Sequence, residues 1–379
     1  MRAWVDPGNN LVMADVDGNI GYLLRGQLPL RGEANGWLPV PGWTGEHEWH
    51  GQIPFEEMPR SHNPAAGYIV TANNRIVGDD YPYYLALDYA PPYRADRIIG
   101  HLQALTQATV ADMAAIHADK FSTPSRIFVG LLDRLTPRDA ASAEAKRRLQ
   151  AWDGTMGPES SAAALYAVWR EQTIGLLLQA PALLPLTTIP AGEKPPGQPV
   201  VLSPRVRGSL LALMQDDDTT ALPAGETWPT LLAEALTRAT RWLTEKLGPD
   251  MDTWQWCRIH RTAPKHVLAG TFQDLAELLN PPSVGVGGDG DTPQVGGYLG
   301  IEGNNYAVTG TSVTRYVFDL ADWDRSAWVV PLGASGHPGS PHYADQVAAW
   351  GQQRLFPMAY STEAVDRAAN TRQRLQPIG

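Results

Sequence analysis

The stretch Leu11–Leu24, LVMADVDGNIGYLL, contains the clearest structural signal in the chain. Two apolar runs, Leu11–Ala14 and Ile20–Leu24, flank the polar segment Asp15–Asn19, which contains the dipeptide Asp17-Gly18. Glycine tolerates the positive φ that a tight turn demands, so this arrangement favours two antiparallel strands joined by a short turn. We therefore predict a β-hairpin at these residues.

The rest of the chain predicts strands, then helices, then strands again. A short buried strand is predicted at Gly67–Ala72, and a proline-rich loop at Pro190–Pro199. The predicted helices are Arg94–Ala104, a helix capped by Thr109, Pro137–Trp152, Ser160–Gln179, Ser209–Gln215, Thr230–Leu247 and Tyr343–Leu355. Later strands are predicted at Ala307–Leu320 and Ala327–Val330, before a polar tail at Thr362–Gly379.

This order predicts an α+β protein with three parts. Residues 1–92 form a strand-rich part, residues 93–265 a mainly helical lobe, and residues 266–379 a return of strands with a C-terminal helix.

Composition points to a globular protein without a nucleic-acid or membrane partner. The 379 residues carry a formal net charge of −10, and no basic cluster stands out. Prolines interrupt the most apolar stretch, Ile174–Pro190, so it cannot cross a bilayer as one helix. The single cysteine, Cys257, excludes an internal disulfide and leaves the cellular compartment undecided. Met1–Asn10 has no signal-peptide pattern, and we expect a soluble protein.

Several segments, each weak alone, occur in a specific order and spacing. They are Ala14–Tyr22, Leu38–Gly42 followed by Trp49, Gly51, Pro54 and Phe55, Asn63-Pro64, Gly67–Asn74, Asp80–Pro82, Ala95–Ile98, Trp152–Gly154, Asp319–Trp323, Gly333–Gly336 and His342–Gln346. Together they resemble the penicillin acylase family of N-terminal-nucleophile hydrolases, over roughly residues 10–360.

The resemblance implies a four-layer αββα sandwich, so we expect an incomplete form of it with a mainly helical insertion. It also implies hydrolysis of linear amides, such as the N-acyl side chains of β-lactams or acyl-homoserine lactones. In this family a precursor cuts itself and frees a serine at the start of the large subunit. The serine attacks the amide carbonyl, its own α-amino group acts as base, and an oxyanion hole holds the intermediate.

The start of the chain departs from the family pattern. The family nucleophile lies well upstream of the hairpin, whereas only fourteen residues precede Asp15 and the chain opens with Met1 and Arg2. We expect the C-terminal portion of the large subunit, inactive without an N-terminal segment or small subunit as partner. Exposed sheet edges should make the isolated chain poorly soluble or self-associating. The alternative is a catalytically inactive remnant that serves as a binding or scaffold protein.

The resemblance implies two site residues. Asn73 matches the family asparagine whose side-chain amide donates to the oxyanion. Without the resemblance, Asn73-Asn74 would simply end a strand, because Asn tolerates the left-handed region. Arg97 matches a family arginine at the rim of the site, where a planar guanidinium suits carboxylates. The alternative for Arg97 is a surface ion pair with Asp96.

We assign no organic cofactor and no metal ligand. Asp15, Asp17 and Asn19 alternate like the start of a calcium loop, but Ile20 and Gly26 stand where an EF-hand needs Gly and Glu. Many full-length members of the family hold a structural calcium ion, and most of its ligands lie upstream of the region matched here.

Other groupings are better explained by packing or by loops. They are the pair His47 and His50, the set Ser335, His337, His342 and Asp345, the thiol of Cys257, and Gly285–Gly290, which predicts a surface loop.

Overall fold

The computed structural model describes residues 2–32, 34–37, 39–181, 183, 203–300 and 305–377, without the side chains of residues 36, 37 and 203–207. The predicted loop at Pro190–Pro199 lies outside these residues. The chain divides into two compact units, Met1–Ala108 with Asp319–Trp323, and Thr109–Phe318 with Asp324–Gly379. The three parts expected at 1–92, 93–265 and 266–379 were defined by changes of secondary structure. The two units are defined by contacts within the folded chain, and the second unit contains both the helical lobe and the later strands.

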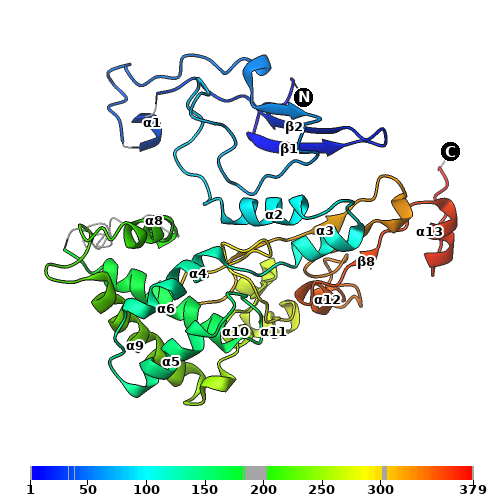
Figure 1. Cartoon of the computed structure of the whole chain (residues 1–379). Coiled ribbons are helices and arrows are strands. Elements are labelled where there is room, and N and C mark those ends of the chain that lie inside the picture. Colours follow the sequence, from blue (N-terminus) through cyan, green and yellow to red (C-terminus); the bar gives the residue numbers. More distant parts are fainter. Residues whose placement is uncertain are drawn as a thin grey trace. The chain divides into compact units, whose positions relative to one another are not determined.

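The first unit is built on a three-stranded antiparallel sheet in the order β1-β2-β3. The predicted hairpin is confirmed, with β1 and β2 in register from Asn9 opposite Arg25 to Ala14 opposite Ile20 (Figure 1). The elements of this unit are β1 Asn9–Ala14, β2 Ile20–Arg25, α1 Ala34–Trp37, η1 Phe55–Glu57, β3 Arg60–His62 and α2 Tyr93–Gln103.

The hairpin turn is closed by the Asp15 carboxylate. Its Oδ1 accepts from the backbone amides of Asp17 and Asn19, and its Oδ2 accepts from the Asn19 side chain at 2.9 Å. The Asn19 hydrogen bonds hold the pKa of Asp15 below its usual value, because they stabilise the carboxylate. These residues therefore build a turn, as the sequence predicts.

The second unit has a helical core. Its helices are α3 Val110–His117, α4 Thr123–Gly130, η2 Leu132–Arg134, α5 Ala140–Gln150, α6 Ser161–Leu177, α8 Ser203–Gln215, α9 Trp228–Leu247, η3 Met251–Thr253, α10 Trp256–Ile259, η4 Val267–Gly270, η5 Gln273–Leu275, α11 Ala276–Leu279, α12 Val347–Gly351 and α13 Thr362–Ala368, and η6 Trp323–Arg325 lies where the two units meet in the sequence. Its strands are β4 Gly296–Gly297, β5 Gly310–Thr311, β6 Arg315–Val317, β7 Ala327–Val329 and β8 Phe356–Pro357.

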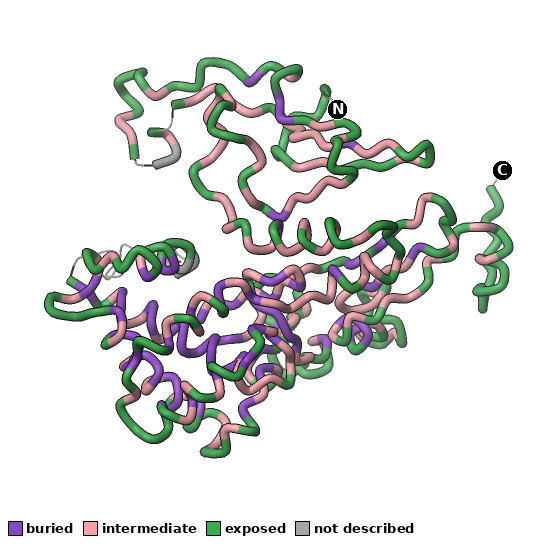
Figure 2. The backbone as a smooth tube through the Cα atoms, viewed as in Figure 1, coloured by how far each residue is buried: buried purple, intermediate pink, exposed green. Residues whose placement is uncertain are grey.

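Helices α6 and α9 bury many residues in this unit, and the buried backbone of its helical part is drawn purple in Figure 2. Helix α6 is apolar nearly all round and buries residues on every side, as expected of a central helix. The indole of Trp169 on α6 donates to the carbonyl of Leu232 on α9 at 3.0 Å, so the two helices are joined by a polar contact inside the core. No helix of the described residues has the length and apolarity to cross a membrane.

Two predicted strands are wrong because pairing depends on distant partners. Gly67–Ala72 pairs with no strand of the described residues, and the amide of Ala72 bonds Oδ1 of Asn74 instead. The stretch Ala307–Leu320 is split, because β5 pairs with β4 whereas β6 pairs with β7. The strand predicted at Ala327–Val330 is confirmed as β7.

The surface loop predicted at Gly285–Gly290 is wrong. Gly285–Gly290 is largely buried, because a Cβ on Gly287 would lie 2.6 Å from the Met156 carbonyl and one on Gly288 would collide with the Gln294 carbonyl. The tail contains α13, whose first turn is capped by the hydroxyl of Ser361. The α+β class itself is confirmed.

Candidate active site

Asn73 lies in the first unit on a sharply turned backbone. Its φ is +62°, in the left-handed region that asparagine tolerates better than most residues. The Asn73 carbonyl accepts from the amide of Ala90 at 2.9 Å. On either side of Asn73, the amide of Ala72 donates to Oδ1 of Asn74 at 3.0 Å. Asn73 itself is exposed, so this loop presents the carboxamide at the surface of the unit.

The orientation of the Asn73 carboxamide follows from its partner. Nη2 of Arg94 lies 3.1 Å from Oδ1 of Asn73. Arginine has donors and no acceptor, so the atom that it contacts must be the amide oxygen. The amide nitrogen Nδ2 is thereby the end that can donate to a negatively charged oxygen. A guanidinium on the oxygen also draws electron density from the amide and strengthens Nδ2–H as a donor.

Arg94 was not singled out by the sequence. It lies in the first turn of α2, three residues before Arg97, and positions three apart are neighbours on a helix surface. Arg97 is half-buried and also has interaction partners of its own. Asn73 is therefore hydrogen-bonded to helix α2, which carries both arginines. The residue that makes this hydrogen bond is Arg94. The Arg-x-x-Arg spacing was the available signal.

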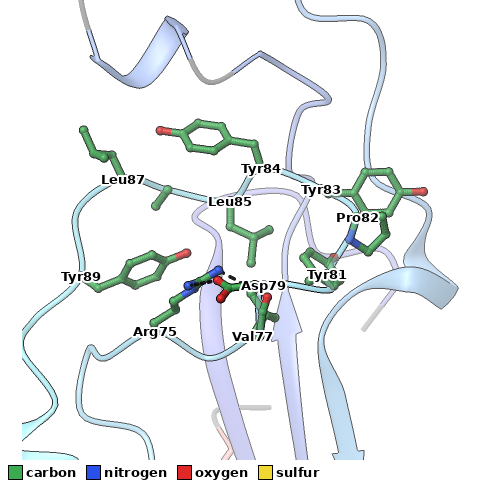
Figure 3. Close-up of a pocket in the computed structure, with 12 residues that line it drawn as sticks. Arg75, Val77, Asp79, Tyr81, Pro82, Tyr83, Tyr84, Leu85, Leu87 and Tyr89 are labelled. Atoms are coloured by element: carbon green, nitrogen blue, oxygen red, sulfur yellow. Dashed lines mark hydrogen bonds and ion pairs between the residues drawn. The ribbon is translucent and has the colours of Figure 1, made fainter.

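A cleft of about 570 Å³ lies along the segment that follows Asn73 (Figure 3). Its lining residues are Arg75, Val77, Gly78, Asp79, Tyr81, Pro82, Tyr83, Tyr84, Leu85, Ala86, Leu87 and Tyr89. Arg75 and Asp79 form an exposed ion pair of 2.6 Å at one side of it. Because both side chains are exposed to solvent, this ion pair adds little to the stability of the fold and makes that side of the cleft polar.

Tyrosines give this cleft its aromatic character. The rings of Tyr81 and Tyr83 meet edge to face, with centroids 5.7 Å apart. The hydroxyl of Tyr81 donates to the Glu57 carbonyl at 3.0 Å, and that of Tyr83 donates to the Glu57 carboxylate. The hydrogen bond to Glu57 raises the pKa of Tyr83, because the carboxylate accepts a proton that only the neutral phenol can donate. A smaller cleft of about 250 Å³ lies beside Tyr84 and Arg31.

The second unit holds a separate polar cluster. Arg170 and Asp291, both largely buried, form an ion pair of 2.7 Å, and the hydroxyl of Ser122 lies 3.3 Å from Asp289. Burial and the nearby Asp291 carboxylate raise the pKa of Asp289. Ser122 is packed beneath the surface of this unit, so we interpret the cluster as structural.

The remaining candidates from the sequence do not assemble into a site. The hydroxyl of Ser335 accepts from the His337 amide at 3.1 Å, and the exposed His342 ring bonds Asp345 at 2.9 Å. Burial raises the pKa of Cys257, as for an unreactive packed thiol. Among the described residues, no group of three or more His, Cys, Asp or Glu side chains is placed to hold a metal ion.

Known proteins resemble this chain along nearly its whole length. A penicillin amidase family model matches residues 1–367. Penicillin acylase 2 proenzyme of Pseudomonas sp. (strain SE83) is 43% identical over 99% of this chain and 47% of its own length. The acyl-homoserine lactone acylase QuiP of Pseudomonas aeruginosa is 28% identical over 97% of this chain and 46% of its own.

The fold has a counterpart among solved structures. The structure of a thermostable penicillin G acylase from Alcaligenes faecalis matches with a TM-score of 0.60 at 23% identity, covering 98% of this chain and 68% of that one. The chain spans about half the length of the curated relatives it matches. With a family model over residues 1–367 and the 43% identity, this chain belongs to the penicillin amidase family.

Proposed function

We propose that this chain is part of an amide hydrolase that cleaves linear N-acyl amides through an acyl-enzyme, with Asn73 as an oxyanion donor. The observation that carries the proposal is the hydrogen bond from Arg94 to Oδ1 of Asn73, which makes Nδ2–H the end of the carboxamide that can donate to an oxyanion. A tetrahedral intermediate places a full negative charge on the former carbonyl oxygen, and a fixed neutral donor at that oxygen lowers the barrier.

The attacking group belongs to a second polypeptide segment in this proposal. The relatives devote less than half of their length to the match with this chain, so they contain further segments that can supply a nucleophile and its base. The chain contributes the donor Asn73 and the rim residue Arg97. The alternative is a binding protein that retains the cleft and has lost turnover.

We propose β-lactam N-acyl side chains as the first substrate class and acyl-homoserine lactones as the second. The 43% identical relative is a penicillin acylase, and the more distant one acts on acyl-homoserine lactones by its name. Arg97 is proposed to engage a carboxylate of the substrate, because its fork of donors can bind both oxygens at once. A phenylacetyl amide of an aminobenzoate and a fatty-acyl amide therefore serve as test substrates.

The experiment is a reconstitution assay. The chain is co-expressed with the part of penicillin acylase 2 proenzyme that lies outside the match, and release of the chromogenic amine is measured. Asn73→Ala should lower kcat by about 10²–10³ because one oxyanion donor is lost. Asn63→Ala is the matched control, because Asn63 also has a positive φ, +46°, but bonds the Ile20 amide in the sheet.

Each outcome of this assay decides something. Turnover that survives Asn73→Ala at the wild-type rate would remove the oxyanion role. Substrate binding without turnover in the reconstituted protein would favour the binding-protein alternative. Equal losses in Asn73→Ala and Asn63→Ala would assign the effect to folding of the unit, which circular dichroism of both variants would reveal.

A further inference from the structure

Arg315 is a buried arginine with no carboxylate partner among the described residues. It lies on β6, is only 2% exposed, and shares the buried face of that strand with Val317. Burial lowers the pKa of Arg315 to about 10, and no described acidic side chain opposes this effect. A charge taken out of water is costly to the fold unless an opposite charge and hydrogen bonds compensate it.

The hydrogen-bonding capacity of this guanidinium is only partly used. Its Nη1 donates to the Trp350 carbonyl at 2.6 Å, and its central carbon lies over the Trp350 ring, 4.3 Å from the ring centre. Its Nε and Nη2 have no hydrogen-bond partner in the described part of the chain. These two nitrogens direct parallel N–H groups from one edge of the planar group, and such an edge binds two oxygens of a single oxyanion. The unused donors therefore match a ligand with two acceptor oxygens.

Two further basic side chains lie near Arg315. His117 ends α3, which packs against β6, and its Nδ1 is also buried with no hydrogen-bond partner among the described residues. Lys120 follows three residues later and uses one of its three N–H groups on the Ala118 carbonyl, at 3.1 Å. Burial, and after it the charge of Arg315, lowers the pKa of both His117 and Lys120, which shows that the guanidinium acts on both groups.

Acidic residues act on Lys120 but leave Arg315 without a counterion. The charges of Asp119 and Glu159 raise the pKa of Lys120 and so oppose part of its lowering. The pKa of Arg315 shows no such opposing effect. Water could accept from Nε and Nη2 but would leave the buried charge uncompensated. An oxyanion would satisfy both the unused donors and the charge.

We propose that Arg315, His117 and Lys120 form a binding site for a small, dissociable tetrahedral oxyanion of the phosphate or sulfate class. Two oxygens of the anion accept from Nε and Nη2 of Arg315, and a third accepts from Lys120 or from Nδ1 of His117. Arg315 is closed in whereas His117 and Lys120 are half-buried, so the anion enters on the side of these two residues. A dianion suits the site better than a monovalent carboxylate, because three basic groups act on one another there.

Ligand-dependent unfolding of the full chain tests this site without any amide substrate. The melting temperature is measured at pH 7 in inorganic phosphate, in sulfate and in chloride at equal ionic strength, and calorimetric titration with phosphate gives the dissociation constant. A ligand that binds only the folded state raises the melting temperature as its concentration rises. Phosphate and sulfate should therefore raise the melting temperature, and chloride should change it little. Because phosphate and sulfate also strengthen apolar burial in any protein, variants of the site are needed to assign the effect.

A matched pair of arginine variants makes this assignment. Arg315→Lys keeps the charge but removes the edge with two donors, so the affinity for phosphate should fall by about tenfold or more. Arg354→Lys is the control, because the Arg354 guanidinium also lies over an aromatic ring, 4.8 Å from the Phe356 centre, but is exposed. The control should bind phosphate within about twofold of wild type. If Arg315→Lys does not fold, Lys120→Gln at the half-buried side replaces it and should weaken binding by about fivefold.

Three results would overturn this inference. Equal phosphate affinity in wild type and in the site variants would remove the basic residues from the binding. An equal rise of the melting temperature in chloride would assign the effect to ionic strength. Phosphate binding that disappears after co-expression with the part of penicillin acylase 2 proenzyme outside the match would make an acidic group of that segment the partner of Arg315. Amide hydrolysis can fail in the reconstitution assay without changing any of these measurements, so the site and the proposed function are tested separately.

Discussion

His260 should make the second unit sensitive to acid. The imidazole is fully buried, stacked on the Trp256 indole with ring centres 4.3 Å apart. Its Nδ1 lies 2.8 Å from the Tyr306 carbonyl, which can only accept, so Nδ1 carries the proton. The other nitrogen, Nε2, has no hydrogen-bond partner among the described residues and faces Gly296 at close range.

Protonation of His260 in the folded state would place an unpaired charge in this core. Burial lowers the pKa of His260 from 6.5 to about 4. Between these two values the unfolded chain binds a proton that the folded chain does not. The His260 contribution is therefore fully present above pH 6.5 and is lost as the pH falls toward 4, at about 1.4 kcal/mol per pH unit. The total loss is on the order of 3 kcal/mol.

The variant His260→Asn isolates this effect. Asparagine can place an N–H near the position of Nδ1 and donate to the Tyr306 carbonyl, and it does not titrate. The free energy of urea unfolding is measured for wild type and variant at several pH values from 7.5 to 4. Other titrating groups, including the buried Asp289, are common to both proteins and cancel in the difference.

We expect the advantage of wild type over His260→Asn to shrink by about 3 kcal/mol from pH 7 to pH 4. His342→Asn is the comparison variant, because it removes a histidine whose ring is exposed instead of one that is buried in the core. If the profiles of wild type and His260→Asn run parallel across this range, the proposed role of the buried imidazole is wrong.

Two further predictions concern the same unit, and both are checked by urea unfolding at pH 7. Gly288→Ala should destabilise the protein by about 2–4 kcal/mol, because Gly288 has φ +80° and no room for a Cβ. The control Gly290→Ala, where a Cβ would meet open space, should cost less than about 1 kcal/mol. Equal effects of the two substitutions would contradict the role assigned to the close backbone contacts of Gly288. Arg170→Met should cost about 3–5 kcal/mol because it leaves the largely buried Asp291 carboxylate without its partner. The control Arg147→Met, at an exposed ion pair, should change the stability little. A neutral Arg170→Met would mean that the buried pair adds no net stability.

Local chemistry explains the predictions that succeeded. The hairpin depends on Asp15–Asn19, whose turn closes with contacts no more than four residues apart. The helix expected after Thr109 begins there, because the Thr109 side chain and Asp112 cap each other's amides. Helices α5, α6 and α9 were predicted from composition and apolar periodicity, and the structure sets their starts at Ala140, Ser161 and Trp228 through the N-caps Asp139, Ser160 and Thr227.

Predictions failed where a distant partner decided the outcome. Gly67–Ala72 has strand-like residues, yet strand formation requires a neighbouring strand that the described residues do not place beside it. The glycine-rich loop reads as a surface loop in sequence, but it is buried because residues such as Met156, far away in sequence, approach its backbone. Composition alone carries no information about such approaches.

The sequence by itself determined the hairpin, the presence of the main helices, the α+β class and the family resemblance with Asn73 as a candidate. The tertiary structure decided that Arg94 bonds Asn73 across 21 residues of sequence, that His260 meets Tyr306 across 46, and that, among the described residues, β1 lies at an edge of its sheet. The physical reason is range. Turns and caps are satisfied within a few residues, whereas the orientation of an amide, the burial of an imidazole and the pairing of an edge depend on groups that only folding brings together.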